Sequence, residues 1–257
     1  MQGLIVKDDR RYDYTEAYLE ARGIRFRGER GGPGRLDFAI LPFAQDVDEE
    51  VYGATFFSGL RQGAPVFSGV RKAYIADMCR LHMLEYHPMM DDTGVALENA
   101  VPTSEGVIAY LVQNTDVTLA GSRVLVAGYG ICGADLSRRL KVLGADVYAL
   151  VRTQGKADEA EQDGVLPLYL REATEQSFDA VVNTIPAQVF TEEKLASFGG
   201  ALFVDIASKP YGFDMEAAKR LNNRSALLPG LPGKCAVRTA GEILGKYVYE
   251  VLRGKRL

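Results

Sequence analysis

The feature that most constrains the fold of this chain is a G-x-G-x-x-G turn formed by residues 128–133. The turn ends the short apolar run Arg123–Gly130 and leads into a segment with apolar side chains at helical spacing. Those side chains are Cys132, Leu136, Leu140 and Leu143, and Gly144 supplies the C-cap of the predicted helix. A further apolar run, Asp146–Val151, follows. A strand, a glycine turn, a helix and a second strand in this order predict a dinucleotide-binding unit, and a turn that serves only close packing is the alternative.

The rest of the C-terminal half repeats short apolar runs that alternate with helical patterns. The expected strands are Val165–Leu168, Phe178–Pro186, Ala201–Ala207 and Ser225–Leu228. Between them, Thr191 followed by Glu192 and Glu193 is typical of a helix N-terminus, and Asp214–Leu221 is a second expected helix. Because alternating strands and helices form parallel sheets with right-handed crossovers, we predict a Rossmann-type α/β fold. Its doubly wound parallel sheet is covered on both faces.

The N-terminal part of the chain alternates more weakly, and no phosphate-binding glycine pattern follows its first apolar run. The expected strands are Leu4–Val6, Ile24–Arg27, Phe38–Leu41, Pro65–Phe67 and Leu84–Tyr86, and Gly31–Gly34 is an expected loop. These features predict a smaller α/β domain that does not itself bind a dinucleotide.

We place this smaller domain at residues 1–100 and the dinucleotide-binding domain at residues 101–238. Residues 101–115 form the expected connecting helix, with Thr103 or Ser104 as its N-cap. Its apolar stripe is Val107, Ile108, Leu111 and Val112. Residues 239–257 are expected to form a C-terminal helix that folds back over the junction.

The end of the second strand of the dinucleotide unit indicates which cofactor binds. Proteins that bind NAD usually carry an acidic residue there, which holds the ribose hydroxyls. In this chain Arg152, Thr153 and Lys156 occupy the position, and the first acid is Asp158. A guanidinium, a hydroxyl and an ammonium group suit the 2′-phosphate of NADP, and solvated loop charges are the alternative. The predicted cofactor-binding residues are Gly128, Tyr129, Gly130, Ile131, Cys132, Gly133, Arg152, Thr153, Lys156, Asn183, Thr184, Ile185 and Pro186.

Ligands of open α/β sheets bind at the carboxyl ends of the strands, so the loops at those ends are candidate substrate sites. These loops carry hydroxyl groups and cations in both halves of the chain. The predicted substrate-binding residues are Ser68, Arg71, Thr103, Ser104, Ser208, Lys209, Gly230, Gly233 and Arg238. Such a set of donors suits an anionic substrate with more than one carboxylate. For any single lysine or arginine of the set, a solvated surface position is the alternative.

No side chain of the dinucleotide-binding half stands out as a general base. The two histidines of the chain, His82 and His87, lie in the other half, where we expect them to pack or to be solvated. Glu105 and Tyr211 are candidate proton acceptors by position alone. The three cysteines have no metal-ligand spacing, so we expect small buried hydrophobic residues and no metal site; they are Cys79, Cys132 and Cys235.

The composition excludes several classes of protein. Charged residues make up 25% of the chain and hydrophobic residues 47%, as in ordinary globular proteins. A net charge of −4, from 30 basic and 34 acidic residues, argues against a nucleic-acid-binding surface. No apolar stretch approaches the roughly 18 residues that a membrane span needs, and the N-terminus lacks the apolar core of a signal peptide. We therefore expect a soluble protein of a reducing compartment.

Several linked segments of the chain resemble the A-subunit family of dipicolinate synthases. They are SGVRKAYIADMCR (68–80), NAVPTSEGVIAYLVQNTDVTLAGSRVLVAGYGICG (99–133), VVNTIP (181–186), FVDIASKPYGFD (203–214) and LLPGLPGKCAVRTAGEIL (227–244). The resemblance extends from about Pro65 to Leu252 and is weak over the first sixty residues. It implies a formate/glycerate dehydrogenase-like fold, in which a small flavodoxin-like domain accompanies the Rossmann domain.

The resemblance also implies an activity: NADP-dependent oxidation of dihydrodipicolinate to dipicolinate (pyridine-2,6-dicarboxylate), on a branch of lysine biosynthesis, in the cytoplasm of the mother cell of a sporulating bacterium. The implied partner is the flavoprotein-like B-subunit of dipicolinate synthase, and we also expect a homo-oligomer. Lys209 and Arg238 would then clamp the substrate carboxylates, and further hydrogen bonds would come from Ser68, Thr103, Ser104, Ser208 and the Gly230–Gly233 backbone. Two alternatives are another NADP-dependent oxidoreductase of the same architecture and a non-catalytic NADP-binding regulatory protein.

Overall fold

The computed structural model describes residues 1–27 and 35–254 of the chain. Residues 28–34, which include the expected loop Gly31–Gly34, and residues 255–257 lie outside the described residues. The chain divides into two compact units. The N-terminal unit comprises Met1–Asn99 and Ala236–Leu257, and the central unit comprises Ala100–Cys235. Each unit is an α/β structure built on its own parallel sheet.

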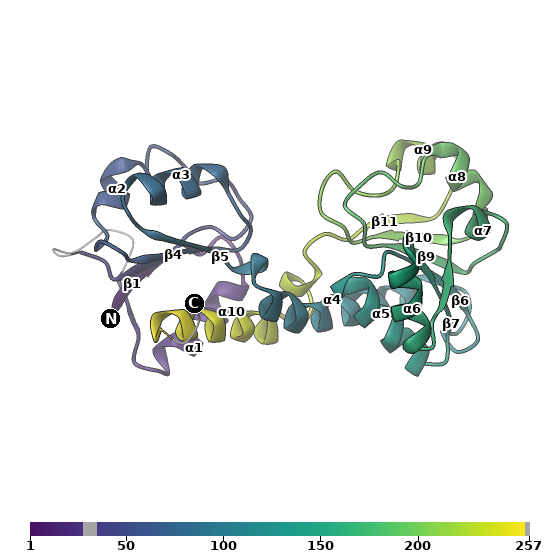
Figure 1. The fold of residues 1–257 in the computed structure, drawn as a ribbon, viewed down its shortest axis with the longest axis horizontal. Coiled ribbons are helices and arrows are strands. Elements are labelled where there is room, and N and C mark those ends of the chain that lie inside the picture. The colour runs from purple at the N-terminus through teal and green to yellow at the C-terminus, as the bar shows by residue number, and fades with distance from the viewer. Residues whose placement is uncertain (28–34, 255–257) are drawn as a thin grey trace. The chain divides into compact units, whose positions relative to one another are not determined.

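The N-terminal unit contains a five-stranded sheet in the order β2-β1-β3-β4-β5. Figure 1 labels β1, β4 and β5 of this sheet. Its strands are β1 (Gln2–Ile5), β2 (Arg25–Phe26), β3 (Phe38–Ile40), β4 (Pro65–Ser68) and β5 (Glu85–Pro88). Its helices are α1 (Arg11–Glu20), α2 (Ala54–Ser58), α3 (Ala73–Leu81), the short η1 (Met89–Asp91) and α10 (Val237–Leu252). This strand order is that of flavodoxin-like folds, and it reverses between β1 and β3.

Alternate residues of each strand in the N-terminal unit face opposite layers of helices, as the geometry of a strand requires. Phe38 and Ile40 of β3 belong to the core that contains α1 and α10, whereas Ala39 belongs to the core that contains α2 and α3. Helix α10 lies against α1, and the hydroxyl of Thr15 donates a hydrogen bond of 2.9 Å to the carbonyl of Gly241. A Cβ atom at position 241 would overlap the backbone of α1, so glycine permits this close contact.

The central unit contains a six-stranded parallel sheet in the order β11-β10-β9-β6-β7-β8. Its strands are β6 (Arg123–Ala127), β7 (Asp146–Leu150), β8 (Leu166–Leu168), β9 (Ala180–Asn183), β10 (Leu202–Asp205) and β11 (Ser225–Leu227). Its helices are α5 (Ile131–Val142), α6 (Gln154–Gln162), α7 (Leu170–Thr174), α8 (Glu192–Ser197), α9 (Met215–Arg220) and the short η2 (Leu231–Gly233). This is the Rossmann order, and it reverses between β6 and β9. The predicted fold class is therefore confirmed.

Helices cover both faces of the central sheet. Val124 and Val126 of β6 pack in the core with α4 (Thr93–Asn114), α5 and α6, whereas Leu125 and Ala127 pack in the core with α7, α8 and α9. Two expected core residues are nevertheless exposed at the surface: Leu143 by 46% and Val112 by 60%. Leu143 follows the last residue of α5, so the helical periodicity no longer directs its side chain inward.

The connecting helix begins eight residues earlier than the sequence predicted. Helix α4 spans Thr93–Asn114 and continues through Pro102, so neither Thr103 nor Ser104 is its N-cap. The Asp92 side chain instead accepts a hydrogen bond of 2.9 Å from the N–H of Val95 in the first turn. Burial of Val95, Val107 and Leu111 outweighs the cost of an internal proline. The boundary between the two units falls inside this helix.

Candidate functional site

The glycine turn of the central unit has the geometry that a bound pyrophosphate requires. Gly128 has a φ of +95°, a backbone angle that residues with a side chain rarely adopt. A Cβ atom there would lie 2.6 Å from the Thr184 hydroxyl. A Cβ at Gly133 would overlap the carbonyl oxygen of Gly128, so this glycine permits close packing of α5 on β6. At Gly130, in contrast, no atom lies within 4 Å of the position a Cβ would take. The turn is therefore tight on its inner side and open on its outer side.

A cavity of about 570 Å³ opens directly on this turn, at the reversal of strand order. Its lining residues are Gly128, Tyr129, Gly130, Leu150, Val151, Arg152, Thr153, Lys156, Leu170, Ile185, Ala187 and Val189. Gly130 is the N-cap of α5 and has no side chain to cap the N–H groups of the first turn. The positive end of the α5 dipole is therefore available to an anion in the cavity.

The end of the cavity beside β7 is basic. Arg152 and Thr153 are exposed, and Thr153 is the N-cap of α6 but does not use its hydroxyl for capping. Lys156 lies one turn further on and contacts Glu159 with Nζ and Oε2 2.6 Å apart. The described residues that line the cavity include two cations and no carboxylate. This end of the cavity therefore favours an anionic group.

Tyr129 connects the glycine turn to helix α6. Its hydroxyl donates a hydrogen bond of 2.7 Å to Asp163, which also accepts one of 3.0 Å from Arg138. The hydrogen bond from Tyr129 lowers the pKa of Asp163 most, and the hydrogen bond from Arg138 lowers it further. Burial, and to a smaller extent the neighbouring carboxylate, raises the pKa of Tyr129. Because its hydroxyl is engaged, we expect Tyr129 to contact a cofactor through its backbone and the edge of its ring.

The remaining predicted cofactor residues lie beside the cavity and do not line it. The Thr184 hydroxyl donates to the carbonyl of Ala127 at 2.8 Å, and the buried amide of Asn183 donates to the carbonyl of Ile185 at 3.0 Å. Both side chains thus shape the loop after β9, from which Ile185 reaches the cavity wall. The other predicted residues outside the lining are Ile131, Cys132, Gly133 and Pro186.

The structure places the predicted substrate residues of the central unit in three segments. Ser208, Lys209 and Tyr211 share the loop after β10, where Ser208 and Lys209 are exposed. Thr103 and Ser104 are buried inside α4, and the Ser104 hydroxyl has no hydrogen-bond partner among the described residues. The third segment is η2, which ends at Gly233 and has Gly230 as its N-cap.

Glu105 and Tyr211, the two candidate proton acceptors, lie in different surroundings. Glu105 borders a groove of about 610 Å³ between α4 and α5, with Oε1 4.0 Å from an Arg139 nitrogen. That groove shares no lining residue with the cavity at the glycine turn. Tyr211 is half-buried on the loop that also carries Lys209.

Three predicted substrate residues belong to the N-terminal unit. Ser68 is buried, and its hydroxyl is engaged with the Val70 carbonyl at 2.8 Å and with the Tyr86 hydroxyl at 2.7 Å. Arg71 lines a cavity of about 470 Å³ and pairs with Asp91 at 2.7 Å. The third, Arg238, is exposed on α10 and pairs with Glu242 at 2.8 Å.

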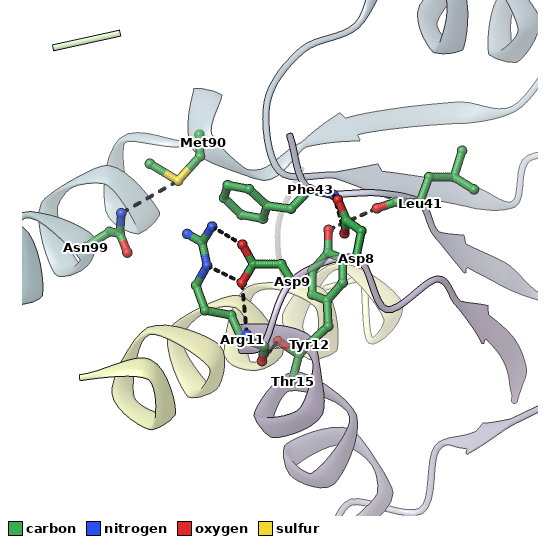
Figure 2. Close-up of polar contacts among 9 residues, drawn as sticks. All are labelled: Asp8, Asp9, Arg11, Tyr12, Thr15, Leu41, Phe43, Met90 and Asn99. Carbon is green, nitrogen blue, oxygen red and sulfur yellow. Dashed lines mark hydrogen bonds and ion pairs between the residues drawn. The ribbon is translucent and has the colours of Figure 1, made fainter. Parts of the chain in front are cut away.

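A polar cluster at the strand reversal of the N-terminal unit escaped prediction from the sequence (Figure 2). Both carboxylate oxygens of Asp8 accept from the N–H of Phe43, at 2.8 and 2.9 Å. Asp9 accepts hydrogen bonds of 2.8 and 2.7 Å from the Arg11 guanidinium, which lies 3.6 Å from the centroid of the Phe43 ring. The buried Tyr12 hydroxyl donates to the carbonyl of Leu41 at 2.9 Å. The signal in the sequence is the run of five charged residues, Lys7 to Arg11, shortly after β1.

The histidine rings lie in aromatic surroundings. His82 stacks on Phe57 with ring centroids 6.2 Å apart, and His87 stacks on Phe67 at 5.3 Å. Burial lowers the pKa of His87, and Glu85 opposes that shift. The three cysteines are free thiols, and burial raises the pKa of Cys79 to about 12. Within residues 1–27 and 35–254, no group of three or more metal-ligating side chains is close enough to hold an ion, and no helix is long and apolar enough to cross a membrane.

Comparison with known proteins places this arrangement in a family. No protein-family model matches the chain. The A-subunit of dipicolinate synthase from Bacillus subtilis (strain 168) is 30% identical over 232 residues, which is 85% of this chain and 78% of that protein. The crystal structure of dipicolinate synthase, A chain, from Bacillus subtilis superposes with a TM-score of 0.91 at 25% identity and covers 100% of this chain and 97% of that one.

D-lactate dehydrogenase from Escherichia coli superposes with a TM-score of 0.64 at 14% identity, covering 99% of this chain and 98% of that one, which shows a dehydrogenase-like fold. The strand order of both units and the glycine turn agree with this result. The chain belongs to the A-subunit family of dipicolinate synthases.

Proposed function

We propose that this protein is an NADP-dependent oxidoreductase that converts dihydrodipicolinate to dipicolinate. The observation that carries the proposal is the cavity at the glycine turn, whose open face at Gly130 and basic end at Arg152 suit a phosphorylated dinucleotide. Membership of the A-subunit family of dipicolinate synthases supports the choice of substrate.

The residues at the cavity fit NADP at both of its phosphate groups. The backbone of Gly128–Gly130 and the first turn of α5 would hold the pyrophosphate, because Gly130 leaves that side of the turn open. Arg152, Thr153 and Lys156 would hold the 2′-phosphate. When bound, the cofactor supplies a hydride acceptor. The chain binds and orients the nicotinamide, and apolar residues such as Leu170 and Val189 exclude water from the cavity wall.

The substrate is a dianion, and the proposal assigns its carboxylates to cations and hydroxyls of the chain. Lys209 and Ser208 are exposed on the loop after β10 of the central unit. We assign carboxylate binding to Lys209, with a hydrogen bond from Ser208. Oxidation of a dihydropyridine yields an aromatic ring, so the reaction needs no strong base. Of the two candidate proton acceptors, Tyr211 shares the loop of Lys209 and is the one that the proposal retains.

The test of the cofactor is a charge reversal at the basic end of the cavity. Arg152→Asp should weaken NADP binding at least tenfold relative to NAD, because it replaces a cation by a carboxylate beside the 2′-phosphate. Arg171→Asp is the matched control, since Arg171 is an exposed cation of the same unit that does not line the cavity. Titration of both variants with NADPH and NADH measures the ratio of affinities. An unchanged ratio in Arg152→Asp would refute the choice of NADP.

The test of the reaction is formation of dipicolinate by the purified chain. Dihydrodipicolinate and NADP should give the ultraviolet absorbance of the pyridine dicarboxylate together with that of NADPH. Saturable NADP binding without turnover would favour the regulatory alternative, in which the flavoprotein-like B-subunit performs the chemistry. Turnover of a different cyclic imine or keto acid in preference to dihydrodipicolinate would favour another oxidoreductase of the same architecture.

We further propose that the chain forms a homo-oligomer through the groove between α4 and α5. Val142 and Leu143 line this groove and are exposed, Val142 by 86%. The groove is lined by two acids and two arginines, so two copies can face each other without net repulsion. Light scattering should report an oligomer for the wild-type chain and a monomer for Val142→Glu. A monomeric wild-type chain would contradict the proposal.

A further inference from the structure

A fully buried carboxylate stands at the carboxyl end of β10, one strand from the reversal of the central sheet. Asp205 accepts four hydrogen bonds: Oδ1 from the Ala207 N–H at 2.9 Å and the Asn183 amide at 3.0 Å, and Oδ2 from the N–H groups of Gly212 and Phe213 at 2.7 and 3.2 Å. Three of the four donors belong to the loop that follows Asp205 itself. One side chain thus holds both ends of that loop.

The same carboxylate joins the loop after β10 to the loop after β9. Asn183 donates to Asp205 and exchanges hydrogen bonds with the backbone of Ile185, which lines the cavity. The carbonyl of Gly212 accepts from the N–H groups of Val189 and Phe190 at 3.1 and 2.9 Å. A Cβ atom at Gly212 would overlap the Asn183 side chain, so the two loops approach each other closely at this point.

A carboxylate satisfies this set of donors, and an amide does not. All four groups around Asp205 are N–H donors, and a carboxylate accepts at both oxygens. An asparagine would turn an NH₂ group toward at least one buried N–H, whichever way its amide is oriented. The residue that occupies this position therefore determines whether the loop keeps its shape.

The loop carries the exposed side chains Ser208 and Lys209 between its two held ends. We propose that Asp205 is a positioning residue, which holds residues 206–213 so that the Ser208 hydroxyl and the Lys209 ammonium group together meet an anionic substrate. Asp205 is fully buried and both of its carboxylate oxygens are engaged by N–H donors, so it acts through the loop. The inference rests on the proposed function for the identity of the substrate, and it adds the residue that organises its binding site.

The test compares Asp205→Asn with Asp179→Asn. Asp179 is the matched control, because it accepts a backbone N–H bond of 2.7 Å from Arg123 at the opposite, amino end of the same sheet. Each variant is titrated with NADP and, in its presence, with pyridine-2,6-dicarboxylate. We expect Asp205→Asn to bind the dicarboxylate about tenfold more weakly or worse, with NADP affinity changed by less than about threefold. The KM for dihydrodipicolinate should rise more than kcat falls, and Asp179→Asn should change neither affinity.

Hydrogen exchange provides a measurement that needs no ligand. The amides of Ala207, Gly212 and Phe213 should exchange faster in Asp205→Asn than in the wild-type chain, and remain protected in Asp179→Asn. Lys209→Met should add little to the loss of dicarboxylate affinity in Asp205→Asn, because both substitutions remove the same contact. If Asp205→Asn does not fold, Gly212→Ala disturbs the same pair of loops through Asn183 and should show the same selective loss.

Three outcomes would overturn the inference. They are wild-type dicarboxylate affinity in Asp205→Asn, an equal loss of NADP and dicarboxylate affinity, and additive effects of Asp205→Asn and Lys209→Met. A wild-type chain that neither binds nor produces the dicarboxylate would refute the proposed function instead, and the exchange measurement would still report whether Asp205 holds the loop.

Discussion

Each unit has a parallel sheet whose strand order reverses once, but the reversal point is open in one unit and filled by side chains in the other. In the central unit, Gly128 and Gly130 follow the first strand, and a cavity of about 570 Å³ opens on them. In the N-terminal unit, charged and aromatic residues follow the first strand, and Arg11, Tyr12 and Phe43 fill the reversal point with their side chains (Figure 2). Related topologies thus yield an open cavity in one case and a packed polar core in the other.

The difference arises from side-chain volume and from the partners of the charges. A Cβ at Gly130 would meet no atom within 4 Å, whereas the Arg11 guanidinium lies 3.6 Å from the centre of the Phe43 ring. Phe43 also packs against the backbone of Gly69, where a Cβ would overlap its ring. A strand reversal is therefore only a possible binding site, and the residues that follow the strands decide whether a ligand can enter.

The largest effect is expected when a charged side chain is placed at the open reversal point of the central unit. Gly130→Asp should weaken NADP binding at least a hundredfold, about 2.7 kcal/mol, because a carboxylate would occupy the place of the pyrophosphate. The unfolding temperature should stay near that of the wild-type chain, since there is space for the new side chain. Titration calorimetry measures the affinity, and Gly199→Asp, at an exposed glycine of the same unit, is the control. Retained binding in Gly130→Asp would show that the cavity is not the cofactor site.

At the filled reversal point, a similar change should affect stability and not binding. Arg11→Met leaves Asp9 without its ion-pair partner and should lower the free energy of unfolding by about 2 kcal/mol. Burial alone would raise the pKa of Asp9, but the hydrogen bonds from Arg11 outweigh it and lower the pKa. NADP affinity should be unchanged. Arg10→Met, at the exposed neighbouring arginine, should cost little, and an equal loss in the two variants would contradict the role of the Arg11 pair.

The central unit was the more predictable of the two from the sequence. The apolar run, the glycine turn and the helical spacing located β6, α5 and β7 within one to three residues, because each signal is local. The expected strand Phe178–Pro186 is longer than the observed β9, because the apolar residues at its two ends pack on the core from loops and not from the strand. The start of α4 was wrong because a proline usually ends a helix, and tertiary burial overrides that preference here.

The candidate site was predictable only where the chain itself brings residues together. Gly128, Gly130, Arg152 and Lys156 follow two adjacent strands, so their meeting at one cavity follows from the βαβ pattern. Asp8 and Arg11 were overlooked because their partner Phe43 is more than thirty residues away, and unpaired charges in a sequence resemble solvated ones. Asp205 was overlooked because its role depends on Asn183, which lies on the neighbouring strand, and on a loop that returns to it at Gly212.

A smaller effect is expected from the tyrosine of the filled reversal point. Tyr12→Phe removes the hydrogen bond to the carbonyl of Leu41 and leaves a buried acceptor unsatisfied. The free energy of unfolding should fall by about 1 kcal/mol, with NADP affinity unchanged. Tyr14→Phe is the control, because Tyr14 lies on the same helix with 38% of its surface exposed. Equal unfolding free energies for Tyr12→Phe and the wild-type chain would mean that this bond contributes nothing to the packed reversal point.

The smallest effect is a dependence of the N-terminal unit on pH, through His87. Burial lowers the pKa of His87 below the ordinary value of 6.5, and the Glu85 carboxylate, 3.6 Å from Nε2, partly opposes the shift. Between the folded pKa and 6.5, the unfolded chain binds more protons than the folded one, so the free energy of unfolding falls as the pH drops through this window. Hydrogen exchange of the β4 amides, which lie beside His87, reports this local stability.

His87→Gln should remove this part of the pH dependence, which we expect to amount to less than about 1 kcal/mol. Glu85→Gln should do the reverse: without the neighbouring carboxylate the pKa of His87 falls further, and the loss of stability on acidification becomes larger. Because His87 stacks on Phe67 of the N-terminal sheet, the amides of β6 and β7 in the central unit should show neither change. An equal response of both sheets to His87→Gln would mean that the two units do not unfold independently. The stability contributed by each reversal point would then have to be measured on the unfolding of the whole chain.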